Sequence, residues 1–397
     1  MRILKTRAVV TGALAALAVS AVMVVPTGAA IDSAVVVPTP NTAADQGNYL
    51  ESVSCVSASF CVAVGTYSNG VDDQNLALVW NGSTWASQTT PNVWIQSNKL
   101  YGVSCVSASF CVAVGRFDAG SNFETSALHW DGSVWTVETT PNAFAGNDNF
   151  LRAVSCVSTS YCLAVGNGYD GASDQNLSMV WNGSDWTLQA TPNSFGPGQD
   201  NGLYDVSCVS TSFCVAAGDG YDGTARRTTA MVWNGSTWML QSTPNVGAGS
   251  NYLNGLSCVS TSFCVAVGEA MSGDYRTLAM VWDGSTWTLQ STPNVGTASN
   301  YVNHVSCHST SLCVMVGEYA DGSSGQTMAV AWDGSAWTLL ATPNPGAGLE
   351  NSLDAAACVS DRQCVAVGYF ENGTAARTLA MALTGPEPDA GAPATIA

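Results

Sequence analysis

The stretch SCVSASFCVAVG at Ser54–Gly65 occurs again, letter for letter, at Ser104–Gly115. Related versions follow, so that all 14 cysteines fall into C-x5-C pairs whose first members lie 49 to 52 residues apart. The pairs are Cys55 and Cys61, Cys105 and Cys111, Cys156 and Cys162, Cys208 and Cys214, Cys258 and Cys264, Cys307 and Cys313, and Cys358 and Cys364. A period near fifty residues with strand-like contents indicates a propeller or a similar array of repeats.

Each repeat contains four short apolar runs separated by turn residues. The fifth repeat, residues 251–294, contains NYLNGLSC, FCVAVG, TLAMVW and WTLQSTPN, with VSTS, EAMSGDYR and DGST between them. Runs rich in Val, Leu, Phe and Trp that are bounded by Gly, Asn, Asp and Ser predict strands. We therefore predict an all-β fold, a seven-bladed β-propeller of four-stranded antiparallel blades.

The last hairpin of the repeat predicts how blades pack. A two-residue type I′ turn at Asp283-Gly284 would place Met280 opposite Trp287 and Leu278 opposite Leu289. These large side chains would share one face of the blade, and small apolar residues would occupy the other. Stacking large faces on small faces around an axis would bury the surface that one repeat leaves exposed.

The seventh repeat ends without a fourth run, because GPEPDAGAPATIA follows TLAMAL at Thr378–Leu383. The segment Ser33–Asn41, SAVVVPTPN, matches the TLQSTPN ending of the fifth repeat. We predict that residues 31–41 complete the last blade and close a single propeller over residues 31–385. Pro38 is tolerated if this strand is outermost. Residues 386–397, rich in Pro and Ala, are predicted to be a disordered tail.

The N-terminus has the organisation of a secretory signal. Arg2, Lys5 and Arg7 precede an apolar run from Ala8 to Val25, and small residues follow up to Ala30. We predict a signal peptide over residues 1–30 that is cleaved near Ala30. An uncleaved membrane anchor is the alternative, because the apolar run is nearly long enough to span a bilayer. After cleavage the protein is expected to be secreted, monomeric and not inserted in a membrane.

The chain is acidic and rich in apolar residues. Its net charge is −18, 46% of its residues are hydrophobic and 10% are charged, which favours a large buried core over disorder. Three of its 11 basic residues lie in the predicted signal. Nucleic acids and anionic membranes are poor partners for such a chain, because both require a basic surface.

The spacing of the cysteines favours disulfides over a metal site. Each pair straddles a predicted hairpin turn, and closing so short a loop contributes roughly 2 kcal/mol in the chain-entropy estimate. A structural zinc site requires four Cys or His ligands at closer spacing, whereas these pairs lie in separate repeats and the chain has three histidines. We predict seven disulfides, each within one blade, and no cofactor other than a possible calcium ion.

Two groups of residues qualify as ligand contacts. The loops between second and third strands and between blades vary from repeat to repeat, as functional loops on a rigid scaffold do. Among the carboxylates in them, Asp170, Asp219 and Asp222 are calcium candidates, although solvated loop acids are the simpler interpretation. Trp94, outside the paired tryptophans that flank the NGST and DGST turns, is a candidate contact.

The second group begins the first strand of each repeat, which in a propeller lines the central channel. A differing polar dipeptide stands there in every repeat. The candidates are Glu51, Tyr101, Arg152, Tyr204, Asp205, Asn254, His304 and Asp354. The equally good alternative is that these polar residues face a water-filled channel and have no role in binding.

The repeat S-C-V-S-x-S-x-C-x-A-V-G, with W-[ND]-G-S-x-W and T-P-N, resembles arrays in secreted proteins of high-GC Gram-positive bacteria. In architecture it is similar to sialidase-like (BNR) and kelch-like propellers. This resemblance implies the fold and no particular reaction.

The leading hypothesis for function is a secreted or cell-surface scaffold, without enzymatic activity, that binds a glycan or a protein through its variable loops. The alternatives are a sialidase-like glycoside hydrolase or lyase and a purely structural exported module. Sialidase chemistry needs tyrosine, carboxylate and arginine side chains together. This chain offers Tyr101, Tyr204, Asp205, Glu51, Arg152, Arg226, Arg227 and Arg276, and no motif brings them together.

Overall fold

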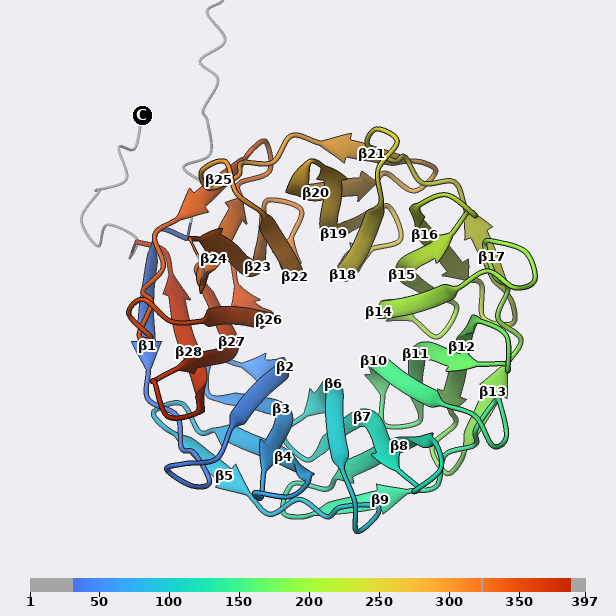
Figure 1. Ribbon diagram of the computed structural model, residues 1–397, viewed down its shortest axis with the longest axis horizontal. Helices are drawn as coiled ribbons and strands as arrows, with labels where there is room; N and C mark the ends of the chain where they lie inside the picture. The colour runs from blue at the N-terminus through green and yellow to red at the C-terminus, as the bar shows by residue number, and fades with distance from the viewer. Residues whose placement is uncertain (1–30, 323, 387–397) are drawn as a thin grey trace, which may run out of the picture.

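The computed structural model describes residues 31–322 and 324–386. Their 28 strands form seven four-stranded antiparallel sheets around a central channel (Figure 1), which confirms the predicted propeller. No helix in this part of the chain is long and apolar enough to cross a membrane. The predicted signal peptide and, apart from Pro386, the predicted tail lie outside the described residues.

Six blades run outward from the channel in chain order, and in the seventh the N-terminal strand is outermost (Figure 1). The innermost strands are β2 (Asn48–Ser57), β6 (Asn98–Ser107), β10 (Asn149–Ser158), β14 (Asn201–Ser210), β18 (Asn251–Ser260), β22 (Asn300–Ser309) and β26 (Asn351–Ser360). The second strands are β3 (Phe60–Ser68), β7 (Phe110–Asp118), β11 (Tyr161–Tyr169), β15 (Phe213–Tyr221), β19 (Phe263–Ser272), β23 (Leu312–Asp321) and β27 (Gln363–Glu371).

The outer half of each blade shows the same regularity. The third strands are β4 (Asp73–Trp80), β8 (Phe123–Trp130), β12 (Asp174–Trp181), β16 (Arg226–Trp233), β20 (Asp274–Trp282), β24 (Ser324–Trp332) and β28 (Ala376–Thr384). The outermost strands are β5 (Trp85–Gln88), β9 (Trp135–Glu138), β13 (Trp186–Gln189), β17 (Trp238–Gln241), β21 (Trp287–Gln290), β25 (Trp337–Leu340) and β1 (Ser33–Val37). We number the blades 1 to 7 from β2–β5 to β26–β28 with β1.

The N-terminal strand closes the ring, as predicted. β1 pairs antiparallel with β28, from Ser33 opposite Thr384 to Val37 opposite Ala380. Pro38 follows the strand, so its missing N–H costs no ladder hydrogen bond. The Asn41 side chain then accepts the N–H of Thr378 at 2.9 Å, the same bond that the asparagine of the TPN segment makes in the other blades.

The core lies between blades. At the interface of blades 4 and 5, Leu278, Met280 and Trp287 pack against Ala217 and Ala230. One such cluster fills each of the seven interfaces around the ring. The prediction that large faces pack on small faces is therefore confirmed, and every blade depends on two neighbours for the burial of its apolar surface.

The predicted register of the last hairpin is wrong by two residues. Trp282 lies opposite Trp287 and Met280 opposite Leu289, so four residues form the loop. A type I′ turn needs positive φ at both central residues, and of the two only Gly284 has it. The Asp283 carboxylate instead accepts the N–H groups of Ser285 and Thr286, at 2.8 Å each. Because the shift is two residues, the predicted faces are unchanged.

All 14 cysteines form disulfides within blades, in the seven predicted pairs. The bonds join Cys55 to Cys61, Cys105 to Cys111, Cys156 to Cys162, Cys208 to Cys214, Cys258 to Cys264, Cys307 to Cys313, and Cys358 to Cys364. In each bond the two residues are paired directly across the first hairpin of the blade. Seven disulfides favour an oxidising environment outside the cytosol.

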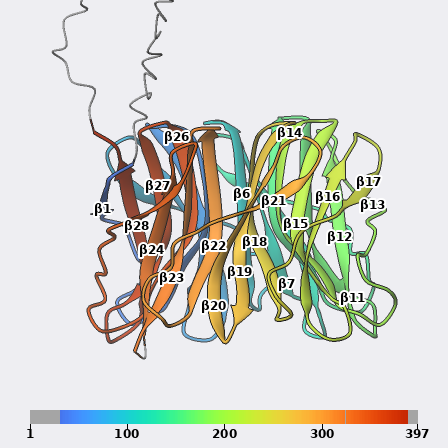
Figure 2. The same cartoon turned by 90° about the horizontal axis from the view of Figure 1, so that it is seen from above.

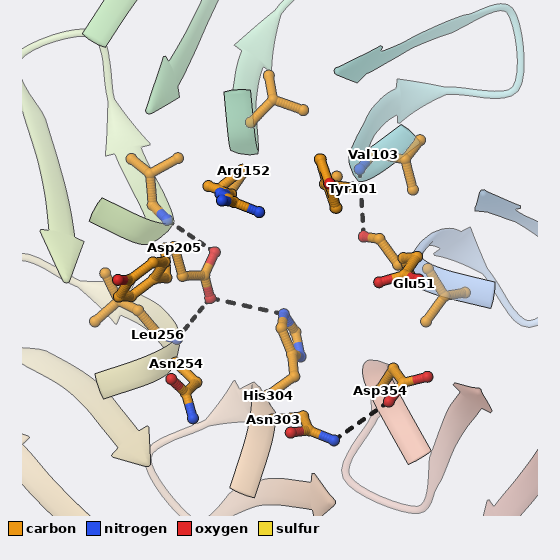
Figure 3. A pocket seen from close by; sticks show the side chains of 17 residues that line it. Glu51, Tyr101, Val103, Arg152, Asp205, Asn254, Leu256, Asn303, His304 and Asp354 are labelled. Atoms are coloured by element: carbon orange, nitrogen blue, oxygen red, sulfur yellow. Dashed lines mark hydrogen bonds and ion pairs between the residues drawn. The ribbon is translucent and has the colours of Figure 1, made fainter. Parts of the chain in front are cut away.

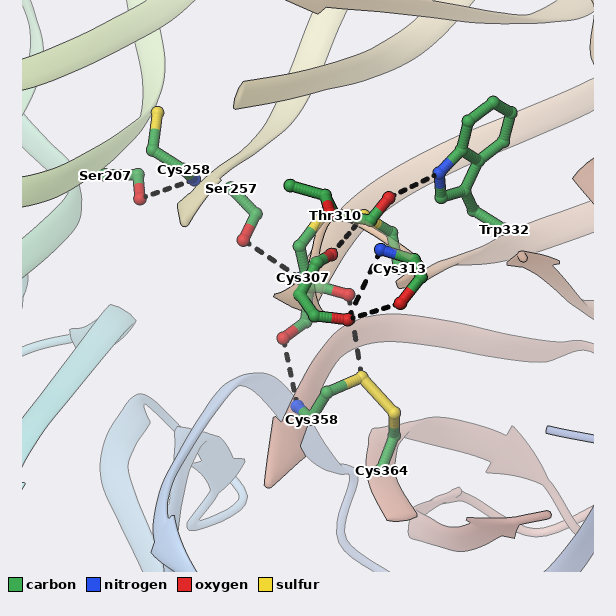
Figure 4. Close-up of a disulfide and its surroundings, with 12 residues drawn as sticks. Ser207, Ser257, Cys258, Cys307, Thr310, Cys313, Trp332, Cys358 and Cys364 are labelled. Carbon is green, nitrogen blue, oxygen red and sulfur yellow. Dashed lines mark hydrogen bonds between the residues drawn. A yellow bond between two sulfur atoms is a disulfide. The ribbon is translucent and has the colours of Figure 1, made fainter. Parts of the chain in front are cut away.

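The two cysteines of each pair differ in their surroundings. The second cysteine is fully buried in the interface between blades: Cys61, Cys111, Cys162, Cys214, Cys264, Cys313 and Cys364 are all at most 1% exposed. These residues therefore belong to the core and are not candidates for ligand contact. In six blades a serine before the first cysteine connects neighbouring blades, as the Ser257 hydroxyl does by accepting the N–H of Cys307 at 3.0 Å (Figure 4).

The two ends of the propeller differ (Figure 2). At the constrained end, which carries the disulfides, short turns contact each other, and Trp80 donates its indole N–H to the Ala58 carbonyl at 3.0 Å. The variable end carries the longer loops. There the buried first residue of each innermost strand is asparagine, and Asn251 accepts the N–H of Val246 at 2.8 Å and donates to the Gly249 carbonyl at 2.8 Å. These asparagines hold the variable loops on the rigid sheet.

Candidate functional site

A β-bulge in every innermost strand directs one side chain toward the channel. In β2, Leu50 pairs with Gly65 and Ser52 with Val64, so Glu51 is left out of the ladder. The same shift occurs in the other six blades. Bulges re-aim side chains and are frequent beside functional sites. The bulged residues are Glu51, Tyr101, Arg152, Tyr204, Asn254, Asn303 and Asp354.

A second ring of differing residues contacts the bulged ring and was not predicted from the sequence. Its members directly follow the glycine of the C-x-A-V-G motif or its variants. They are Thr66, Arg116, Asn167, Asp219, Glu269, Glu318 and Tyr369. The sequence contains a pattern that could have indicated this ring, because this position changes in nearly every repeat while the glycine before it does not.

Side chains of the two rings bond within the same blade. Arg116 donates from Nε to the Tyr101 hydroxyl at 2.9 Å, and Arg152 donates from Nε to the Asn167 amide oxygen at 3.1 Å. In blade 5 the Asn254 amide donates to the Glu269 carboxylate at 2.9 Å. The mouth at the variable end is therefore a preorganised double ring of polar groups.

The bulged residues and the residues that follow them in the innermost strands line a cavity of about 170 Å³ in the channel (Figure 3). Asp205 and His304 face each other in it, with Asp205 Oδ2 3.7 Å from His304 Nε2. The Asp205 carboxylate also accepts the N–H groups of Val206 at 2.8 Å and Leu256 at 2.6 Å. His304 Nδ1 accepts the N–H of Ala356 at 3.3 Å. The pair thus joins blades 4, 5, 6 and 7.

Burial perturbs the titration of the channel acids. It raises the pKa of Asp205 to about 7 although two N–H groups favour its charged form, and it lowers the pKa of His304 to about 4. Burial also raises the pKa of Glu269 to about 7. The pKa of Asp354 is raised by burial and by the nearby Glu51 carboxylate. Perturbed acids in a cavity are a common mark of functional sites.

The structure brings the predicted channel residues together: Glu51, Tyr101, Arg152, Tyr204, Asp205, Asn254, His304 and Asp354 all line the cavity. Trp94 does not join them. It lies 49% exposed in the loop between β5 and β6, with its ring 6.5 Å from that of Phe117.

The three calcium candidates do not converge. Asp170 accepts the N–H groups of Ala172 and Ser173, and Asp222 caps its own turn in the same way. Asp219 is buried and pairs with Arg226 at 2.9 Å. Across residues 31–322 and 324–386, no three His, Cys, Asp or Glu side chains are grouped as metal ligands.

Three arginines considered for sialidase chemistry stabilise loops. Arg226 pairs with Asp219 and Asp200, and Arg227 pairs with Asp222 at 2.7 Å. Arg276 donates to the carbonyl of Ala298 at 3.0 Å. None of them lines the channel cavity. The arrangement therefore contains no cluster of three free arginines built from these residues.

No protein-family model matches the chain, and no curated protein matches it in sequence. Several solved structures share its fold. YCF48 from Cyanidioschyzon merolae is 13% identical with a TM-score of 0.53, covering 88% of this chain and 98% of its own. YCF48 bound to D1 peptide is 12% identical with a TM-score of 0.52, covering 89% and 97%. A PL25 ulvan lyase bound to GlcA(1-4)Rha3S is 9% identical with a TM-score of 0.54, covering 83% and 91%. Such similarity shows a common propeller fold alone.

Proposed function

We propose that the protein is a secreted or cell-surface binding scaffold that recognises a glycan or a protein at the variable-end mouth of its channel. The observation that carries this proposal is the contrast within each repeat. The ladder, disulfides and bridging serines hardly change, whereas the bulged residue and the residue after the glycine change from blade to blade. If the propeller served only as a stable module, these two positions would have no reason to differ between blades that are otherwise so alike.

Binding partners of two similar propellers agree with the proposal. The YCF48 structure holds a D1 peptide, and the ulvan lyase structure holds a saccharide.

Export agrees with the seven disulfides and with the signal-like segment at residues 1–30. N-terminal sequencing of protein collected from the culture medium tests the export: a start near residue 31 supports it, and retention of residues 1–30 in a membrane fraction contradicts it.

Screening the purified protein against glycan and peptide panels tests the binding function. We expect a ligand whose affinity falls when Tyr204→Ala or Asn303→Ala removes a mouth side chain. Met239→Ala, on the exposed outer strand β17, is the matched control and leaves binding unchanged. Absence of any glycan or peptide ligand contradicts the proposal and favours a structural module.

A second candidate function is cleavage of a bound saccharide. The Asp205 carboxyl favours it, because burial in the cavity raises its pKa to about 7, where an acid or base operates efficiently. The same screen decides between the two. Product release that is lost in Asp205→Asn supports cleavage, and binding without any product supports the scaffold.

A further inference from the structure

Blades 2 and 3 carry a row of alternating cations and aromatic rings at the mouth. The Arg116 guanidinium lies 3.7 Å from the centre of the Phe123 ring and 5.5 Å from that of Phe150. The Arg152 guanidinium lies 4.8 Å from the centre of the Phe150 ring and 4.9 Å from that of Tyr101. The two guanidinium groups thus share the Phe150 ring between them.

The two arginines lack a direct ion pair among the described residues, although the charge of Arg152 lies near enough to the Asp174 carboxylate to favour its ionised form. Within the described part of the chain, neither Arg116 nor Arg152 forms an ion pair with a carboxylate, and each uses only its Nε in a side-chain hydrogen bond. By contrast, Lys99 beside them pairs with Glu51 at 2.7 Å. Partial burial and mutual repulsion of two cations cost free energy that an ion pair normally offsets. Arg362 and Arg377 also form no ion pair within the described residues, but each donates from an Nη group to a backbone carbonyl, which Arg116 and Arg152 do not.

The stacking also fixes the direction of the guanidinium groups. Cation–π contacts hold each plane against a ring, and the bonds from Nε hold each side chain at its base. The terminal Nη groups therefore remain as a planar pair of donors. Such a fork matches a carboxylate, because two parallel N–H bonds reach its two oxygens. Because the side chains are already ordered, binding loses little side-chain entropy.

The opposite side of the mouth suits hydroxyl groups. Blades 5 and 6 present the amides of Asn254 and Asn303, and the carboxylates of Glu269 and Asp354 accept hydrogen bonds from them. An amide can donate to or accept from a sugar hydroxyl, and a carboxylate accepts from one. The bulged side chains that line the cavity are polar or aromatic in all seven blades, which suits the hydroxyl groups and ring faces of a saccharide.

We propose that the mouth binds an acidic saccharide whose uronate carboxylates are held by Arg116 and Arg152 while its hydroxyls face blades 5 and 6. This inference rests on the proposed binding function and specifies its ligand class. The two cations make the side of the mouth at blades 2 and 3 locally positive, in contrast to the net charge of −18 of the whole chain.

The test uses short oligosaccharides of galacturonate, glucuronate and mannuronate, each beside its carboxyl-reduced counterpart, in calorimetric titrations of the full chain. We expect binding of at least one uronate series, and binding of its reduced form weaker by about tenfold or more, because a hydrogen bond to a charged group is lost. Arg116→Gln and Arg152→Gln should each weaken uronate binding by a similar factor. Raising the salt concentration should weaken it too.

Arg362→Gln is the matched control, because it removes the same charge at the constrained end, where Arg362 donates to the Pro386 carbonyl. It should bind like the parent. Circular dichroism and the melting temperature check folding, and Arg116→Lys and Arg152→Lys serve if a Gln variant unfolds. A folded Lys variant that keeps part of the parent's uronate affinity and still prefers the uronate over its reduced form supports a charge contact, and one with unchanged affinity for both forms contradicts it.

Equal affinity for uronates and their reduced forms, or full binding by both Gln variants, overturns the acidic-saccharide inference while leaving the binding scaffold intact. Binding of peptides but of no saccharide overturns the inference in the same way. Failure of every glycan and peptide to bind overturns both proposals.

Discussion

At the scale of single residues, the glycine of each C-x-A-V-G motif allows the bulge to form. A Cβ atom at Gly268 would overlap the carbonyl oxygen of Tyr252, the residue two places before the bulged Asn254. The corresponding glycine of every other blade faces the same carbonyl position. The first and second strands therefore approach more closely here than any residue with a side chain permits.

Replacing this glycine should destabilise the whole blade. We expect Gly268→Ala to lower the free energy of unfolding by about 1–3 kcal/mol, as overpacking does in a filled interior. Urea denaturation followed by tryptophan fluorescence measures the change. Gly196→Ala is the control, because a Cβ there meets no atom within 4 Å, and it should unfold like the parent. A harmless Gly268→Ala would contradict the steric role.

Buried acids at the mouth make the stability of the protein depend on pH. The pKa of Glu269 is raised to about 7 by burial, so between about pH 4.5 and 7 the folded protein holds a proton that the unfolded chain has released. The contribution of Glu269 to the free energy of unfolding therefore decreases as the pH rises from about 4.5 to 7. Asp205 and Glu318, with pKa values raised to about 7, act in the same sense, whereas His304 opposes them below about pH 6.5.

Glu269→Gln should remove part of this dependence. The amide keeps the size of the side chain and carries no charge, so we expect it to raise stability at pH 8 by about 1–3 kcal/mol and to change it little at pH 4. Melting temperatures across this range provide the measurement. Asp283→Asn is the control. Hydrogen bonds in its turn lower the pKa of Asp283, so this group stays ionised between pH 5 and 8, and the slope of melting temperature against pH should not change in that range. An unchanged slope in Glu269→Gln would refute the prediction.

At the scale of elements, a ring of serines connects neighbouring innermost strands near the disulfides. Ser54, Ser104, Ser155, Ser207, Ser257 and Ser306 each accept the N–H of the first cysteine in the next blade. The seventh position, between blades 7 and 1, holds Ala357, which has no hydroxyl. The interface between blades 7 and 1 thus lacks the bond that the other six interfaces share.

Restoring the missing hydroxyl should strengthen that interface. We expect Ala357→Ser to stabilise the protein by about 0.5–1.5 kcal/mol through a bond to the N–H of Cys55, and Ser257→Ala to destabilise it by a similar amount. Thermal unfolding of both variants tests the pair. Destabilisation by Ala357→Ser would show that the added oxygen finds no partner there.

The strands and their pairing order followed from the sequence, because apolar runs and turn residues repeat seven times in the same order. The register of Asp283–Thr286 did not, because the Asp283 side chain bonds to backbone N–H groups and selects a longer loop than its Asp-Gly pair suggests. Most channel residues were predicted from their position in the first strand. Arg116 and the rest of the second ring were missed, because their approach to the mouth depends on the bulge.

At the scale of the whole molecule, the ring is closed by strands from opposite ends of the chain. β1 covers the edge of β28, and Arg377 donates to the carbonyl of Ala43, so the segment is held beyond the strand itself. Without β1 the backbone groups of β28 would be an unpaired edge, which is a template for association with another chain.

A protein that begins at residue 42 should therefore associate and melt at a lower temperature than one that begins at residue 31. Size-exclusion chromatography and thermal unfolding measure the two effects. A synthetic peptide of residues 31–42 added in trans should restore the monomer, because it can occupy the open edge. A stable monomer without residues 31–41 would contradict the closure role.

The bulge has a consequence for engineering. Because the bulged residue takes no part in the ladder, its identity is uncoupled from strand pairing. Randomising this position in every blade would give a combinatorial library displayed on one invariant, disulfide-bonded frame. Selection from such a library would yield new specificities without redesign of the scaffold, as antibody repertoires achieve with loops.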